Sequence, residues 1–180
     1  MLGPQLSFDT CYLDGEHLSG GVDGDYRDDL PLDRMRAQSI GTNWGGIPMI
    51  LSLCKEKDVK EANSLLAVWT LHMPAHCITS VLAWPLPIWR AYSVDRAFGF
   101  DAQTHRLGYW ENSGVVQAAP GSVHVTLYHK PGSVLVVASN LTDEYADAEV
   151  MLDAAALGQT ADTLQAWPPR GEPEGRPRLR

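Results

Sequence analysis

The secondary-structure pattern of this chain changes near Phe98, and this change limits the folds that the chain can adopt. Up to that point, short apolar runs typical of strands alternate with segments of helical spacing. Beyond it, strand-like runs follow one another and are separated by turn signals. Alternation predicts a parallel sheet with helical crossovers, whereas successive strands predict antiparallel sheets. The sequence therefore predicts an α/β region followed by an all-β region.

The α/β region is expected to have the order βαβαβα. Strands are predicted over residues 6–13, 47–53 and 77–84, and helices over residues 31–40, 59–72 and 88–98. The second helix has the clearest pattern, because Val59, Ala62 and Leu65 recur at helical spacing and Pro74 stops the run. Three parallel strands leave two unpaired sheet edges, a liability that natural sheets avoid. We therefore expect self-association of this chain through exposed strand edges.

The second region contains several runs of strand-forming residues. They cover residues 108–110, 123–129, 133–139, 144–152 and 163–167. The turn Lys130-Pro131-Gly132-Ser133 joins the two longest runs, which is typical of an antiparallel hairpin. Residues 169–180 carry proline, glycine and charge with almost no apolar side chains, so we expect a disordered tail there.

Composition excludes several classes of partner. Of the 180 residues, 44% are hydrophobic and 20% are charged, as in globular domains. The formal net charge of −8 argues against a nucleic-acid partner. No apolar run reaches the roughly 20 residues of a membrane helix, so we expect no membrane partner. The first residues do not resemble a signal peptide, and if the protein is exported, its signal is expected to lie outside this chain. The three cysteines lack C-x-x-C spacing and are interpreted as thiols in a core.

Five motifs carry a resemblance to a known group of proteins. They are Tyr12-Leu13-Asp14-Gly15-Glu16, Leu32-Asp33-Arg34-Met35-Arg36-Ala37, Gly41-Thr42-Asn43-Trp44-Gly45, Gly108-Tyr109-Trp110-Glu111-Asn112 and Leu135-Val136-Val137-Ala138-Ser139-Asn140-Leu141. In this order and spacing, over roughly residues 6–167, the chain resembles the C-terminal portion of uncharacterised proteins related to glycoside hydrolase family 123.

This resemblance implies a fold of two parts. Residues 1–98 would form the last three βα units of a (β/α)₈ barrel, and residues 99–168 an antiparallel β-sandwich accessory domain. A complete barrel needs about 250 residues, so we expect this chain to be a fragment of a longer protein. The parent would hydrolyse glycosidic bonds, and this chain alone is expected to be inactive.

Asp14 and Glu16 are the leading catalytic candidates. They follow a predicted strand, and residues two apart on an extended chain point to the same side. Glycoside hydrolysis commonly uses one carboxyl group as an acid and another as a base or nucleophile. In a barrel, the carboxyl end of each strand faces the active site, so the neighbouring His17 is a candidate for sugar binding. The alternative interpretation is an ordinary polar loop with an Asp-Gly turn.

The resemblance also offers a second role for this pair. Family 123 enzymes use adjacent Asp and Glu residues on an earlier strand, together with the acetamido group of the substrate as nucleophile. Here Gly15 separates Asp14 from Glu16. On this view the principal pair is missing from the chain, and both residues bind sugar hydroxyls from a peripheral position.

Three further residues are candidates for substrate binding. Tyr26 and Arg27 lie in a loop that could line the barrel mouth, and Trp84 lies at the end of the third predicted strand. Aromatic faces stack on sugars, although a tryptophan that caps the core is an equally good interpretation of Trp84.

No metal or cofactor is expected. The segment 23–29 resembles a calcium loop, but Arg27 occupies a ligand position and the glutamate of an EF-hand is absent. His72 and His76 have helical spacing, but Pro74 breaks the helix that would align them for zinc. No phosphate-binding, dinucleotide-binding or serine-hydrolase motif occurs.

Two functional hypotheses follow. The first is a fragment of a glycoside hydrolase-like enzyme whose parent acts on carbohydrate. The second is a noncatalytic carbohydrate-binding or structural module, in which the sandwich matters and Asp14 and Glu16 are loop residues.

Overall fold

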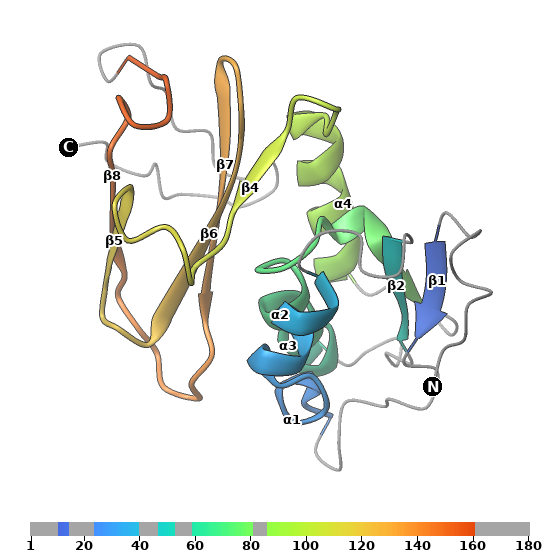
Figure 1. The fold of residues 1–180 in the computed structure, drawn as a ribbon. Coiled ribbons are helices and arrows are strands. Elements are labelled where there is room, and N and C mark those ends of the chain that lie inside the picture. The colour runs from blue at the N-terminus through green and yellow to red at the C-terminus, as the bar shows by residue number, and fades with distance from the viewer. Residues whose placement is uncertain (1–10, 15–23, 40–46, 53–58, 81–85, 161–180) are drawn as a thin grey trace. The chain divides into compact units, whose positions relative to one another are not determined.

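The computed structural model describes residues 11–14, 24–39, 47–52, 59–80 and 86–160 (Figure 1). The chain divides into two compact units, residues 1–92 and residues 93–180. The division lies a few residues before the change of sequence pattern near Phe98. Each unit has its own sheets.

The first unit contains a parallel sheet of three strands. These are β1 (Cys11–Asp14), β2 (Ile47–Ser52) and β3 (Ile78–Ser80), in the order β1–β2–β3. The register pairs Cys11 with Ile47 and Ile50 with Ile78. The predicted parallel pairing is therefore confirmed for these strands.

Helices occupy the stretches between the strands. They are α1 (Tyr26–Asp29), α2 (Leu32–Ser39), α3 (Val59–Trp69) and α4 (Leu86–Phe98), with a short 3₁₀ turn at Ala75–Cys77. The last three helices confirm the helical spacing of the sequence. Only α1 was not predicted, because its single turn lies in a segment with the glycines and aspartates of a loop.

The amphipathic pattern of α3 matches its burial. Leu65 and Val68 are buried with the rest of its apolar face, whereas Val59 and Lys60 are exposed at its start. Burying an aliphatic side chain contributes about 1.5–3 kcal/mol, so this face rather than helix propensity stabilises α3. Trp69 is the last residue of α3, and its indole Nε1 donates a hydrogen bond of 3.3 Å to the carbonyl oxygen of Pro74, which lies beyond the helix.

The second unit contains two antiparallel sheets (Figure 1). One has the order β4–β6–β7, formed by β4 (His105–Leu107), β6 (Val123–Lys130) and β7 (Ser133–Asn140). The other pairs β5 (Val116–Ala119) with β8 (Glu149–Leu152). The predicted hairpin is confirmed, because Lys130 pairs with Ser133 across the turn and Gly132 there has a φ of 78°. A positive φ favours glycine.

The two antiparallel sheets share one hydrophobic core. Val116 on β5 and Leu127 on β6 are buried in the same cluster, and Val150 and Leu152 on β8 pack against it. Leu107 also packs against this cluster, from β4 at one edge of the sheet β4–β6–β7. Side chains of both sheets thus fill one interior.

The structure corrects two details of the second region. Residues 108–110 form a turn, and the neighbouring strand is β4, three residues earlier. Strand β5 was not predicted, because its four residues are too short for a recognisable alternation. The predicted strand at residues 163–167 and the predicted tail at residues 169–180 lie outside the described residues.

The fold class is therefore mixed α/β, with a few helices and small sheets. Among the helices of the described ranges, none combines the length and apolar character needed to cross a bilayer.

Leu127 should be essential for the second unit. Its side chain is completely buried, while Val136, its register partner on β7, is 40% exposed. We expect Leu127→Ala to lower the free energy of unfolding by about 2–5 kcal/mol, because the cavity cannot close fully. Val136→Ala is the matched control and should cost about 1 kcal/mol or less. Urea unfolding measures both, and equal losses would contradict the shared core.

Candidate functional site

The carboxyl edge of the parallel sheet is the first candidate site. Asp14 is the last residue of β1 and pairs with Ile50, and the last residues of β2 and β3, Ser52 and Ser80, pair with each other. The three strands therefore end along the same edge. Glu16, His17 and Trp84 follow β1 and β3 in sequence and lie outside the described residues.

Tyr26 and Arg27 begin α1, where the chain is tied to α3. The Tyr26 side chain is completely buried. Its backbone N–H donates a hydrogen bond of 2.9 Å to the Ser64 hydroxyl, which in turn donates to the Glu61 carbonyl oxygen at 3.0 Å. Tyr26 is thus part of the packing between α1 and α3.

Arg27 is held by Asp25, the N-cap residue of α1. The Asp25 carboxylate accepts hydrogen bonds from the Arg27 backbone N–H at 3.0 Å and from its Nε at 2.8 Å. The Arg27 Nη2 also forms an ion pair with the same carboxylate, and Lys60 Nζ lies 3.9 Å from it. One acidic side chain therefore caps the helix and fixes two basic side chains.

This arrangement controls the charge of Asp25. The carboxylate is almost completely buried, and burial alone would raise its pKa. The Arg27 side chain outweighs burial through its hydrogen bonds, so the pKa of Asp25 lies below its ordinary value. Asp25 thus remains a carboxylate at neutral pH and keeps the guanidinium of Arg27 in place.

The two histidines that have helical spacing, His72 and His76, differ in burial. The His72 side chain is completely buried, and its Nδ1 lies 2.8 Å from the Val68 carbonyl oxygen, one turn earlier. His76 is exposed and lies in the 3₁₀ turn. Within the described ranges, no group of three or more histidine, cysteine or carboxylate side chains is arranged to hold a metal.

The motif at residues 108–112 forms an ordered turn beside β6. The Gly108 N–H donates to the Glu111 carboxylate at 3.0 Å, and the Glu111 N–H donates to the Gly108 carbonyl oxygen, also at 3.0 Å. The buried Asn112 amide donates to the Val125 carbonyl oxygen at 2.6 Å. Tyr109 N–H donates to the Thr126 hydroxyl at 3.2 Å. These contacts explain why glycine, glutamate and asparagine occur together in the motif.

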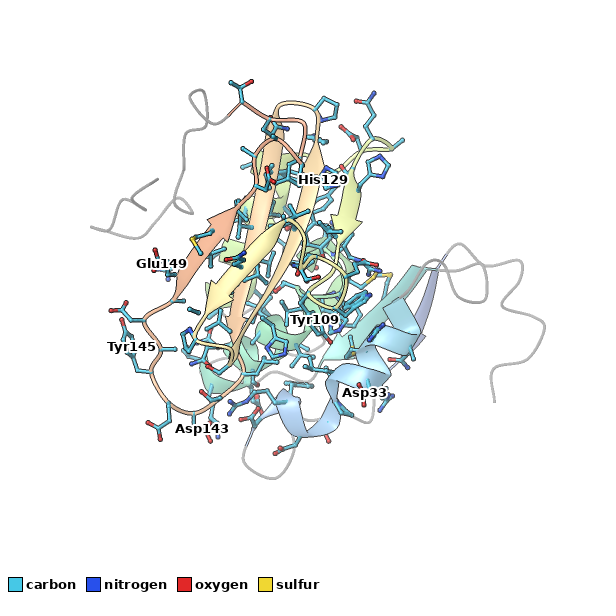
Figure 2. The ribbon with its side chains drawn as sticks, turned by 60° about the vertical axis from the view of Figure 1, so that its left-hand side comes forward. Asp33, Tyr109, His129, Asp143, Tyr145 and Glu149 are labelled. Atoms are coloured by element: carbon cyan, nitrogen blue, oxygen red, sulfur yellow. The ribbon has the colours of Figure 1, made fainter. Side chains whose placement is uncertain are left out.

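The aromatic rings of this turn contact one another and a cation. The Tyr109 ring lies edge-on to Trp110 and to His124, with 4.9 Å between ring centres in each case. The Arg106 guanidinium lies over the Trp110 ring, 5.2 Å from its centre. Figure 2 shows Tyr109 among the side chains of this part of the sheet. Much of the indole surface is therefore engaged by the protein itself.

Glycine is required at position 108 because the Trp110 indole lies against it. A Cβ atom there would stand 2.6–2.8 Å from three atoms of the ring. We expect Gly108→Ala to displace the indole and to lower the free energy of unfolding by about 1–3 kcal/mol. Gly114→Ala, where a Cβ meets open space, is the control and should change stability by about 0.5 kcal/mol or less. Near-ultraviolet circular dichroism and urea unfolding report both effects, and identical behaviour of the two variants would refute the close contact.

Asp25→Asn should reveal the charge of the N-cap, because asparagine caps helices equally well but carries no charge. We expect the wild type to be more stable at pH 7 by about 1.5–3 kcal/mol, the range for hydrogen bonds to charged groups. Since the folded pKa of Asp25 is lowered, this advantage is complete above the unfolded value, about 3.9, and disappears as the pH falls through the folded value. Urea unfolding between pH 7 and pH 2 measures it. Asp33→Asn, at an exposed position of α2, is the control. An advantage that stays constant down to pH 2 would disprove the charged cap.

Comparison with known proteins gives one family match. Searches of curated proteins and of solved structures return no match. Residues 84–170 match the model described as the glycoside hydrolase 123, C-terminal domain. The matched segment includes α4, the strands β4 to β8 that the structure describes in the second unit, and the turn at residues 108–112. Residues 84–170 of this chain are therefore similar to the C-terminal domain of glycoside hydrolase family 123.

Proposed function

We propose that this chain is part of a glycoside hydrolase-like protein that acts on carbohydrate. The observation that carries this proposal is the family match at residues 84–170. The parent protein would hydrolyse glycosidic bonds with carboxylate acid and base groups. A pair of carboxyl groups suits this chemistry, because one protonates the leaving oxygen while the other stabilises positive charge or activates water.

The proposal assigns residues 1–98 to the last three βα units of a barrel. Three features support it: the strands are parallel, their spatial order follows the chain order, and helices lie between them in sequence. This is the arrangement of successive units in a (β/α)₈ barrel. The outer strands β1 and β3 would meet further strands in the parent. In this chain alone their free edges would favour self-association.

The proposal assigns residues 99–168 to an accessory β-sandwich. Its support is the core that the sheets β4–β6–β7 and β5–β8 share. Two sheets whose inner faces fill one interior are the basic form of a sandwich.

The site of sugar contact would be the carboxyl edge of the parallel sheet. Asp14 ends β1 at this edge, and active sites of barrel enzymes form there. Asp14 and Glu16 would act as the acid and base pair or bind sugar hydroxyls, and His17 and Trp84 would line the same edge. Arg27, held by Asp25, would form the neighbouring wall. The completely buried Tyr26 would support this wall from inside rather than touch the sugar.

The proposal predicts weak but specific sugar binding by the 180-residue chain. We expect N-acetylhexosamines to bind in the millimolar range, about −4 kcal/mol, and Asp14→Asn to weaken binding roughly tenfold or more, as loss of a charge-assisted hydrogen bond does. Isothermal titration calorimetry measures both. Asp33→Asn, an exposed acidic residue of the same unit, is the control and should bind like the wild type. Equal binding by both variants would exclude Asp14 from the site.

The same titration separates the two hypotheses. If sugar binds and neither Asp14→Asn nor Glu16→Gln changes the affinity, the chain is a noncatalytic binding module. If no sugar binds, a structural role is favoured.

A further inference from the structure

Two histidines lie opposite each other in the second unit. His105 on β4 and His129 on β6 are register partners in the antiparallel sheet. Their ring centres are 5.7 Å apart and the rings are inclined by 34°. Residues directly opposite on antiparallel strands project from the same face, so the backbone itself holds the two rings together. Figure 2 labels His129, which lies toward one end of its strand.

Both imidazole rings are accessible to solvent, and each contacts the other ring. The His105 side chain is exposed and that of His129 is half-buried. Within the described part of the chain, the ring nitrogens of neither residue form a hydrogen bond or an ion pair, and the only ring contact of each is with the other. His124, on the same strand, differs because its Nδ1 lies 3.3 Å from the Ser122 carbonyl oxygen. In the part of the chain that the structure describes, no other group therefore occupies the ring nitrogens of His105 and His129.

We propose that His105 and His129 form a two-histidine zinc site. Imidazole nitrogens bind Zn²⁺ at about 2.0–2.1 Å in tetrahedral geometry, which holds two ring centres roughly 5 Å apart. The ring centres of His105 and His129 are 5.7 Å apart, which is close to this separation. Two histidines supply half of a tetrahedral shell, and water fills the other positions. The affinity is therefore in the micromolar range rather than that of a structural zinc centre.

Binding would clamp the edge of the sheet. Strand β4 has only three residues and pairs with β6 alone in the sheet β4–β6–β7. A metal that binds both strands in the folded state stabilises that state by mass action. The site is independent of the proposed activity on carbohydrate, since it uses none of the residues assigned to sugar contact.

The test uses ZnCl₂ and the full chain without a histidine tag. Calorimetry should give one Zn²⁺ per chain in the wild type. His105→Gln and His129→Gln should each weaken binding roughly tenfold or more, since even outer partners of a metal ligand cause losses of this size. His124→Gln and His76→Gln are matched controls and should bind like the wild type. Long-range ¹H–¹⁵N spectra, in which zinc shifts the coordinated ring nitrogens, should show changes at His105 and His129 alone.

Stability gives a second readout that does not depend on the variants. Zinc should raise the urea midpoint of the wild-type chain, and excess chelator should reverse the increase. The proposal is overturned if the wild type binds no zinc. It is equally overturned if His105→Gln and His124→Gln lose affinity to the same extent, or if the nitrogen shifts occur at other histidines.

Discussion

Strand β6 is the element on which the second unit depends, because both of its edges pair with other strands and residues on both of its faces are buried. It pairs with β4 on one side and with β7 on the other, and Leu127 at its middle is completely buried. The turn at residues 108–112 is attached to the same strand through Val125 and Thr126. At its end, Lys130 donates hydrogen bonds to the Gly99 carbonyl oxygen and to Asp101, which joins the segment after α4 to the sheet. Turn, sheet and core are therefore parts of one cooperative assembly.

The first unit is organised by the connections between its parallel strands. Its parallel strands require long connections, and these contain the helices. Polar groups fix the first of these helices: Asp25 caps α1, and Ser64 on α3 accepts a hydrogen bond from the α1 backbone. The Asp25 carboxylate is buried, so loss of its ion pair with Arg27 would leave an uncompensated buried charge and destabilise the fold.

Sequence patterns predicted the elements whose side chains repeat over a sufficient length. The helix α3 and the hairpin of β6 and β7 were recognised because their periodicity extends over eight or more residues. The single turn of α1 and the four residues of β5 are too short to show a period. The motif Gly108-Tyr109-Trp110-Glu111-Asn112 was recognised by resemblance, but its role as a turn depends on a contact between Gly108 and an indole two residues later.

Among the candidate site residues, some could be selected from a local sequence pattern and others are brought together only by the fold. Asp14 could be selected because it was expected directly after an apolar strand, and in the structure it is the last residue of β1. Asp25 was not singled out as the partner of Arg27, although aspartate is among the residues preferred at helix N-caps. His105 and His129 are far apart in sequence, and only the register of two strands brings them together. Such pairs have no local signature.

The proposed carbohydrate-active site lies at the carboxyl edge of the parallel sheet. The most direct test is a titration of the isotope-labelled chain with an N-acetylhexosamine, followed by amide chemical shifts. The account predicts saturable shifts concentrated at the ends of β1, β2 and β3, around Asp14, Ser52 and Ser80. Shifts confined to the strands of the second unit, or no saturable shift at all, would contradict it.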